Sequence, residues 1–429
     1  MKIIKLTNES KKNILENLLK RSPNNYGKFE AAVNDILADI KENGDKALFD
    51  YTKKFDKADI NESNVIVTQA EIEKAYTQVD AGLIDVIKKA IVNIRSYHEK
   101  QKQYSWFDSK PDGTILGQKI TPLARVGVYV PGGKAAYPSS VLMNVIPAKV
   151  AGVEQIIMCT PPDKEGNVYP TTLVAAHEAG VDVIYKAGGA QAVAAMAYGT
   201  KSIPKVDKIV GPGNIYVALA KKAVFGYVSI DSVAGPSEIM VIADESANPR
   251  FVAADLLSQA EHDEMASAIL VTTSEDIACK VSNEVDNFVK QLSRKEIIQQ
   301  SLDNYGYILV ADSMEEAVEV ANDIASEHLE IVTQNPFDIM TKIKNAGAIF
   351  LGDYSSEPLG DYFAGPNHVL PTNGTAKFFS PLSVDDFIKK SSIISYSKNA
   401  LEAVHTDIET FANAEYLTAH ANSIHVRFE

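Results

Sequence analysis

Two side chains near residue 260 have the spacing of metal ligands carried on a helix. The segment Gln259-Ala260-Glu261-His262 ends a predicted helix that begins at Asn248-Pro249, where an asparagine cap and a proline at the first position are typical of a helix start. Residues three apart lie on one helix face, and histidine nitrogen is a common zinc ligand. A metal site at Gln259 and His262 is one interpretation, and a charged helix end is the other.

A glutamate and a histidine stand side by side where a predicted helix turns into a strand. Glu327-His328 follows a helix opened by the capping box Ser313-x-x-Glu316 and precedes the apolar run 329–332. Carboxylate and imidazole are proton acceptors of different basicity, which suits general acid–base catalysis. An acid–base pair at this corner is the functional interpretation, and an exposed charged turn is the alternative.

Two further pairs of polar residues lie in a loop and near the end of the chain. Asp361 and His368 fall in the Gly/Pro/Asn-rich segment 352–382, and long loops on a rigid scaffold often carry functional residues. Glu415 and His420 lie close to the C-terminus. Each pair is either part of a site or a feature of the surface.

The two cysteines indicate a reducing compartment and no thiol chemistry. Cys159 ends a predicted strand and Cys279 falls in a helical stretch, so they offer neither a disulfide framework nor a CxxC metal site. Small buried thiols are the default interpretation for both. Nothing around them resembles a thiol-dependent site of aldehyde oxidation.

Three glycine-rich turns follow predicted strands and would suit a phosphate ligand. They are Pro131-Gly132-Gly133, Gly188-Gly189-Ala190-Gln191 and Gly211-Pro212-Gly213-Asn214. Glycines let backbone N–H groups approach phosphate at the start of the next helix, and ligands of open α/β sheets bind beyond the carboxyl ends of the strands. The dinucleotide fingerprint GxGxxG is absent. The alternatives are an atypical nucleotide site and tight turns without a ligand.

The elements that must position these residues alternate between strands and helices. Helical patterns follow each of four short apolar runs, at 126–130, 155–159, 181–185 and 208–210. Four such units predict a parallel sheet covered by helices. A second alternating block predicts strands at 239–243, 269–271, 307–310, 329–332 and 348–351. The predicted fold class is therefore α/β.

The remaining segments are predicted to be mainly helical. Residues 28–55 and 70–104 have apolar residues at helical spacing. Residues 1–25 are predicted to form a polar arm with one short helix, and the chain from 383 onward is predicted to be mostly helical.

Composition limits the class of protein. A length of 429 residues suggests about two to four domains, and 45% apolar residues are ordinary for a globular chain. A net charge of −14 disfavours a generic nucleic-acid binder and binding to an anionic membrane surface. The N-terminal residues turn polar too early for a signal peptide, and no run approaches a membrane span. We expect a soluble cytoplasmic protein without nucleic-acid or membrane partners.

Taken together, these segments resemble the histidinol dehydrogenase family. The resemblance covers nearly the whole chain, with the motifs in the family's order. The helical segment 28–55 also fits, with Gly44-Asp45-x-Ala47-Leu48 and Tyr51-Thr52-x-x-Phe55-Asp56. The motifs that carry the resemblance are VGVYVPGG (126–133), YPSSVLMN (137–144), GPGN (211–214), DSVAGPSE (231–238), QAEH (259–262), SEHL (326–329), GDYFAGPNH (360–368) and LTAHAN (417–422).

The resemblance implies a role for each matching residue. The implied zinc ligands are Gln259, His262, Asp361 and His420. The implied catalytic proton acceptors are Glu327 and His328. The implied substrate pocket comprises Ser237, Glu415, His328 and the four zinc ligands, with His368 nearby. The implied NAD contacts are Tyr129, Gln191 and Asn214.

The family also implies an architecture of two Rossmann-like domains, one inserted in the other. After an N-terminal arm, 1–22, the larger domain would comprise 23–128 and 237–382, and the NAD-binding insert 129–236. The segment 383–429 would complete the active site of a partner in a homodimer with exchanged segments.

The implied reaction is the last step of histidine biosynthesis, the oxidation of L-histidinol to L-histidine through histidinaldehyde. It would use two NAD⁺, one water and one zinc ion per subunit. Three alternatives stay open at this point: a related zinc and NAD enzyme for another polar alcohol, a zinc hydrolase, and a non-catalytic metal-binding protein.

Overall fold

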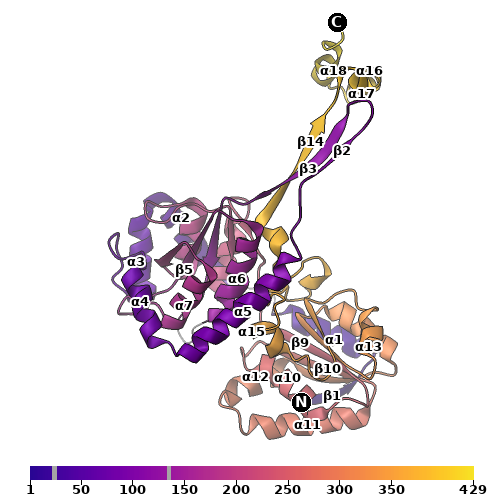
Figure 1. The fold of residues 1–429 in the computed structure, drawn as a ribbon. Helices are drawn as coiled ribbons and strands as arrows, with labels where there is room; N and C mark the ends of the chain where they lie inside the picture. Colours follow the sequence, from indigo (N-terminus) through magenta and orange to yellow (C-terminus); the bar gives the residue numbers. More distant parts are fainter. Residues whose placement is uncertain (22–26, 133–136) are drawn as a thin grey trace. The chain divides into compact units, whose positions relative to one another are not determined.

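The computed structural model describes residues 1–21, 27–132 and 137–429. The chain divides into two compact units (Figure 1). The first comprises Met1–Gln101 and Leu123–Phe387, and the second comprises Lys102–Pro122 and Ile388–Glu429. Among the described residues, none of the helices combines the length and apolarity that a membrane span requires.

A six-stranded parallel sheet forms one half of the first unit. Its strand order is β1-β11-β10-β9-β12-β13, and every pairing is parallel. The strands are β1 (Lys2–Lys5), β9 (Glu238–Ala243), β10 (Ser267–Thr272), β11 (Gly306–Val310), β12 (His328–Val332) and β13 (Ala348–Leu351). The central strands are continuous apolar runs because helices cover both of their faces.

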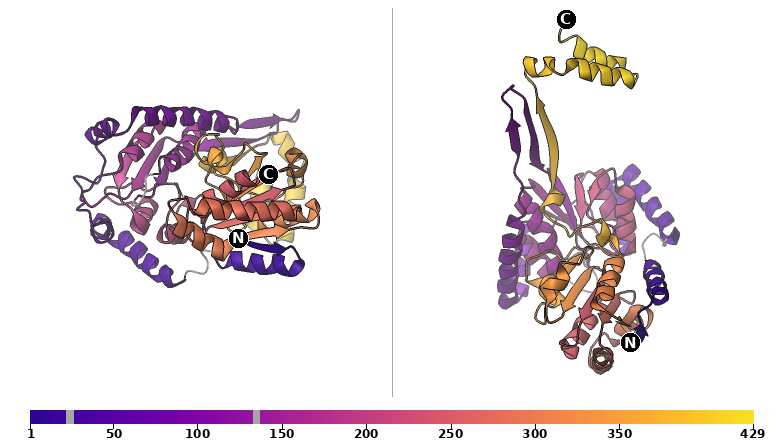
Figure 2. Two further views of the ribbon diagram at one scale, coloured as in Figure 1. Left: turned by 90° about the horizontal axis from the view of Figure 1, so that it is seen from below. Right: turned by 90° about the vertical axis from the view of Figure 1, so that its right-hand side faces the viewer.

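Helices cover the two faces of this sheet separately (Figures 1 and 2). One core contains side chains of α10 (Pro249–Ala260), α11 (Glu275–Val289) and α12 (Lys295–Tyr305). The other contains side chains of α1 (Asn8–Leu19) and α13 (Met314–Ile324). Two short helices follow the last strands, α14 (Pro336–Met340) and α15 (Glu357–Tyr362). The predicted second strand–helix block is confirmed.

The N-terminal segment is more than the polar arm that we predicted. Its helix is present as α1, but residues 2–5 form β1, which pairs in parallel with β11. Leu6, Ile14 and Leu18 are buried in the core beneath. A four-residue strand gives no periodic signal, and its partner residues lie 305 positions further along the chain, so sequence pattern alone missed it.

A five-stranded parallel sheet forms the other half of the first unit. Its strand order is β6-β5-β4-β7-β8. The strands are β4 (Arg125–Tyr129), β5 (Gln155–Thr160), β6 (Val183–Lys186), β7 (Lys208–Val210) and β8 (Ser229–Ile230). The covering helices are α6 (Pro138–Ala151), α7 (Pro170–Ala179), α8 (Gly189–Tyr198) and α9 (Ile215–Val224). The four predicted strand–helix units, and with them the α/β fold class, are confirmed.

The helices of residues 27–99 form an outer layer over this five-stranded half. They are α2 (Gly27–Asn43), α3 (Asp45–Phe55), α4 (Gln69–Gln78) and α5 (Ala81–Glu99). Helices α6 and α8 are buried on nearly all sides, and such helices need a second layer of cover. Side chains of α2 and α3 share a core with α8, and those of α4 and α5 share one with α6.

The described helices of 27–99 bury their apolar faces with elements of 129–236. The predicted grouping of 23–128 with 237–382 in the larger domain stays a proposal. The boundary between 22 and 23 lies outside the described residues. The remaining boundaries stay a proposal.

The second unit contains a three-stranded antiparallel sheet and three helices. The strand order is β14-β3-β2, with β2 (Trp106–Ser109), β3 (Ile115–Pro122) and β14 (Ile388–Ser395). The helices are α16 (Lys398–Glu402), α17 (His405–Ala414) and α18 (Thr418–His425). The prediction of a mostly helical C-terminal segment therefore missed β14. Its sequence is polar and largely exposed, and its partner strand lies far away in the chain.

Candidate active site

A cavity of about 1010 Å³ lies in the first unit, lined by residues of both its halves. Tyr129 ends β4, and Gly189 and Gly211 follow β6 and β7, so the five-stranded sheet offers its carboxyl edge. The six-stranded sheet contributes its amino edge, because Ser237 precedes β9 and His328 begins β12. The rule that ligands bind at carboxyl ends predicts only the first of these walls.

Glu327 and His328 are held by the two backbone groups of one residue, Glu238. The N–H of Glu238 donates to Glu327 Oε2 at 3.0 Å, and the carbonyl oxygen of Glu238 accepts from His328 Nδ1 at 3.0 Å. A carbonyl can only accept, so Nδ1 carries a proton and a neutral His328 has its lone pair on Nε2. This Nε2 is buried and has no hydrogen-bond partner among the described residues. In the neutral form of His328, this atom can take a proton in the cavity.

Burial and neighbouring charges shift the pKa values of this pair. Burial raises the pKa of the Glu327 carboxyl to about 8. Burial lowers the pKa of His328, but the carboxylates of Glu327 and Asp361 outweigh it and raise the pKa to about 10. The Asp361 carboxylate lies 3.8 Å from His328 Nε2. Perturbed groups in a cavity are typical of an active site.

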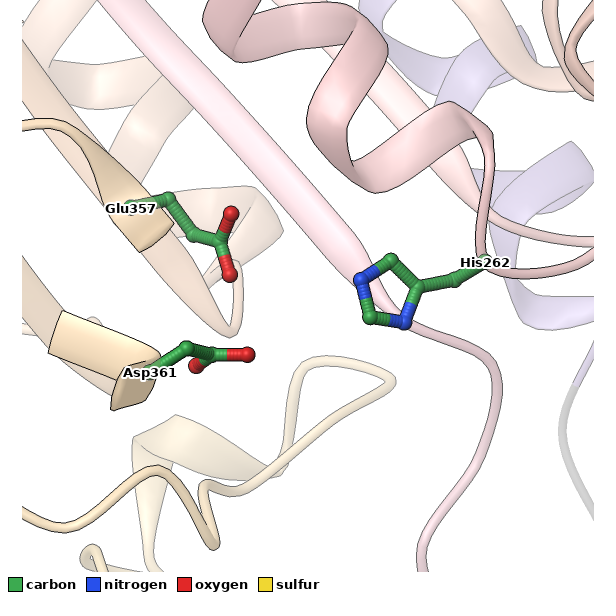
Figure 3. A group of neighbouring side chains, drawn as sticks. All are labelled: His262, Glu357 and Asp361. Atoms are coloured by element: carbon green, nitrogen blue, oxygen red, sulfur yellow. The ribbon is translucent and has the colours of Figure 1, made fainter. Parts of the chain in front are cut away.

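Three ligand-type side chains converge on one another (Figure 3), and one of them, Asp361, is the carboxylate near His328. The nearest donor atoms of His262, Glu357 and Asp361 all lie within 4.8 Å of one another. Glu357 and Asp361 are four residues apart on α15 and share a face of that helix. His262 reaches them from the turn after α10. Burial is the main cause that lowers the pKa of His262, which favours the neutral, metal-binding imidazole.

Gln259 supplies an independent sign that this cluster accepts a ligand. The residue is 1% exposed and lines the cavity. Neither its amide oxygen nor its amide nitrogen has a hydrogen-bond partner among the described residues. A buried amide without partners is costly. A metal ion bound by the amide oxygen would satisfy that oxygen, so the residues present fit a metal centre.

Glu357 is the member of the cluster that sequence reasoning missed. It is buried, its Oε2 accepts from Ser258 Oγ at 2.9 Å, and its N–H donates to Glu330 Oε1 at 2.9 Å. Burial and the nearby Asp361 carboxylate raise its pKa to about 7. The segment was predicted to be loop, and the i, i+4 spacing to Asp361 becomes a signal only once α15 is known.

His368 is packed against Asp361. Its Nδ1 donates to the backbone oxygen of Asp361 at 3.1 Å, and the residue lines the cavity. This contact ties the loop after α15 back to the helix that carries Asp361.

The three predicted cofactor contacts line the five-stranded wall. Tyr129, Gln191 and Asn214 all border the cavity. The Tyr129 hydroxyl accepts from the Gly189 N–H at 3.0 Å, and the Asn214 side chain caps α9 by accepting from Tyr216 N at 3.0 Å. Gly133, in the first glycine-rich turn, lies outside the described residues.

A buried ion pair holds the third glycine-rich turn. Lys221 and Asp231 pair with each other and are each about 4% exposed. Asp231 Oδ2 accepts from the Gly211 N–H at 2.8 Å, and Lys221 Nζ donates to the Gly211 carbonyl at 2.9 Å. Gly211 has φ +115°, and a side chain there would collide with the Tyr129 carbonyl. The turn therefore requires glycine and is clamped on both sides.

The remaining predicted residues are distributed between the two units. Ser237 lines the cavity. Glu415 follows α17 and His420 lies in α18, and both are exposed in the second unit. The cysteines are free, with Cys159 buried as predicted. The prediction that Cys279 is buried is wrong, because it lies on the outer face of α11.

Comparison with known proteins identifies the family. The family model described as histidinol dehydrogenase matches residues 19–428. The chain belongs to the histidinol dehydrogenase family. Histidinol dehydrogenase of Halalkalibacterium halodurans is 61% identical over 398 residues, or 93% of each chain, and that of Clostridium acetobutylicum is 57% identical over 96% of each chain.

A solved structure agrees with this assignment. The crystal structure of histidinol dehydrogenase from Elizabethkingia anophelis has a TM-score of 0.94 and 42% identity, and the match covers 100% of this chain and 98% of that one. The resemblance drawn from the sequence motifs is thus confirmed at the level of the histidinol dehydrogenase family.

Proposed function

We propose that this chain oxidises L-histidinol to L-histidine through histidinaldehyde, with two NAD⁺ and one water consumed, as the last step of histidine biosynthesis. The observation that carries the proposal is the free, buried Nε2 of His328 beside the cluster of Gln259, His262 and Asp361. Membership of the family supports the choice of substrate.

A metal centre fits the donor set described above. Gln259, His262 and Asp361 would hold zinc, and His420 contributed by the other chain of the proposed homodimer would be the fourth ligand. A zinc ion held there would orient the carbinol carbon of L-histidinol through nitrogen atoms of the substrate. A cation on Asp361 also offsets a carboxylate that raises the pKa of His328, and this favours the neutral imidazole that a base requires.

His328 and Glu327 divide the proton transfers between them. In the first oxidation, His328 Nε2 takes the alcohol proton as the carbinol carbon gives its hydride to NAD⁺. As Glu327 removes a proton from the water that adds to the aldehyde, His328 returns its proton to the aldehyde oxygen, which forms the hydrate and frees Nε2 again. In the second oxidation, His328 takes a hydroxyl proton of the hydrate as a second hydride leaves. The hydrate route needs no cysteine nucleophile.

The five-stranded wall would receive NAD⁺. Backbone N–H groups at the glycine-rich turns suit its phosphates, and Tyr129, Gln191 and Asn214 border the same space. From there the nicotinamide must reach the carbinol carbon of the substrate, which is held beside His328 on the opposite wall.

We expect Lys221 to support NAD⁺ binding indirectly, by holding the Gly211 turn in place. Lys221→Met combined with Asp231→Asn removes both charges, and we expect the KM for NAD⁺ to rise about tenfold or more while the zinc content and the KM for L-histidinol stay close to wild type. Steady-state kinetics with each substrate varied in turn check this. Lys222→Met, which removes the neighbouring half-exposed lysine, serves as the control. Equal changes in both KM values would contradict a role confined to the cofactor turn.

We further propose a homodimer in which Glu415 and His420 of one chain complete the partner's site. A mixed dimer of His328→Asn and His420→Asn chains tests this, because one intact site is restored only when the segments are exchanged. We also propose the cytoplasm as its compartment, since two free cysteines suit reducing conditions.

Product analysis tests the proposed activity. The purified protein is incubated with L-histidinol, NAD⁺ and zinc, and the products are separated by chromatography. L-Histidine is the expected product. Zinc-loaded, folded protein that leaves L-histidinol unchanged would overturn the proposal and direct attention to other polar alcohols or to hydrolysis.

A further inference from the structure

A buried arginine from the N-terminal segment meets the residue that holds the acid–base pair. Arg21 follows α1, is 0% exposed, and pairs through Nη2 with Glu238 Oε1. Its Nη1 donates to the Met265 carbonyl at 2.9 Å, and its Nε donates to the Leu18 carbonyl at 3.3 Å. All three nitrogens of the guanidinium group are therefore engaged.

The arginine that pairs with Glu238 also contacts several other elements of the six-stranded half. Leu18 belongs to α1, and Met265 precedes β10. The guanidinium carbon lies 5.1 Å from the centre of the Tyr305 ring at the end of α12. Arg21 thus joins three elements of the six-stranded half to the first residue of β9, the strand between β10 and β12.

The backbone of Glu238 in turn positions the two proposed catalytic side chains. Its N–H holds Glu327 and its carbonyl holds His328, each at 3.0 Å. Glu238 is 3% exposed, so its side chain has no water to compete with Arg21. A shift of Glu238, the first residue of β9, would move both catalytic groups together. Small displacements of reacting groups slow catalysis strongly.

We infer that the Arg21–Glu238 ion pair is a positioning device for Glu327 and His328. Stability alone is a weak reason for such a pair, because replacing a buried ion pair by apolar side chains of similar volume is often neutral or stabilising. The inference rests on the proposed function, and it adds two positioning residues that touch neither substrate nor cofactor.

The central test is a charge-free pair in the full-length protein. Arg21→Met with Glu238→Leu keeps the backbone groups of residue 238 and leaves no buried charge alone. We expect a melting temperature near that of wild type, an unchanged zinc content and KM for L-histidinol within about threefold, but a kcat lowered about 10–100-fold. Arg250→Met, which removes an exposed arginine paired with Glu284, is the control and keeps the wild-type kcat.

A spectroscopic readout separates positioning from a general loss of structure. In protein with ¹⁵N-labelled histidine, His328 should give an Nδ1–H signal, assigned by its absence in His328→Asn. We expect this signal to weaken or shift in the charge-free pair. An unchanged kcat together with an unchanged Nδ1–H signal would overturn the inference.

Arg21→Lys is a second variant that tests the inference if the charge-free pair does not fold. Lysine retains the charge but cannot reach three acceptors in a planar fork, so kcat should fall by less than in the charge-free pair. A folded Arg21→Lys with wild-type kcat and an unchanged His328 signal would contradict positioning. Wild-type protein without NADH formation would instead refute the proposed function, while the His328 signal would still report on the ion pair.

Discussion

Replacing His328 with asparagine is expected to lower the turnover of L-histidinol by about 10²–10⁴-fold, while the protein keeps its zinc. Asparagine can still donate to the Glu238 carbonyl, so the local hydrogen bond is conserved. What disappears is the acceptor at Nε2 that takes the substrate proton. Turnover measured by NADH absorbance and zinc measured by mass spectrometry check the two halves of this expectation.

Glu327→Gln is the companion variant and separates the two oxidations. Glutamine can still accept from the Glu238 N–H, but it cannot take a proton from water. We expect the first NADH to form and the second to be slowed, so that histidinaldehyde accumulates or is released. His177→Asn, a change on α7 away from the cavity lining, serves as the control. Unchanged turnover in both His328→Asn and Glu327→Gln would remove these residues from the mechanism.

The second large effect is expected at Asp361. Asp361→Asn removes a charged ligand from the proposed metal centre, and we expect zinc affinity to fall more than about 100-fold, with activity lost accordingly. Zinc titration against a competing chelator measures this. The cause is direct, because carboxylate oxygen is a normal zinc ligand and an amide is a much weaker one.

Glu357→Gln is the matched comparison, since Glu357 lies one turn before Asp361 on the same helix face. We treat Glu357 as a neighbour that orients the ligands through Ser258, and such partners typically change metal affinity about 10–100-fold. A loss of zinc in Glu357→Gln as complete as in Asp361→Asn would show that Glu357 is itself a ligand.

Much of the fold followed from local pattern. The buried central strands are continuous apolar runs, and glycine-rich turns follow three of them, so most strands of both sheets of the first unit were predicted. Strands β1, β2, β3, β8 and β14 were not predicted, because they are short, polar or exposed. The partners of β1 and β14 also lie far away in the chain. Their formation depends on pairing that no window of sequence contains.

The residues of the candidate site could be predicted where a side chain with suitable chemistry lies in one of the matched motifs. Gln259, His262, Asp361, Glu327 and His328 line one cavity, as the motifs implied. Arg21 and Glu357 were not predicted, because an isolated arginine after a helix and a glutamate in a presumed loop carry no spacing signal. Only the fold brings Arg21 to Glu238 and Glu357 to His262.

We expect one metal-dependent site to perform both oxidations. Counting the NADH molecules formed per L-histidinol consumed, with and without a chelator, tests this. The expected result is two NADH per L-histidinol, loss of activity on chelation and recovery with zinc. One NADH per L-histidinol with free aldehyde as the end product, or full activity in the chelated protein, would contradict it.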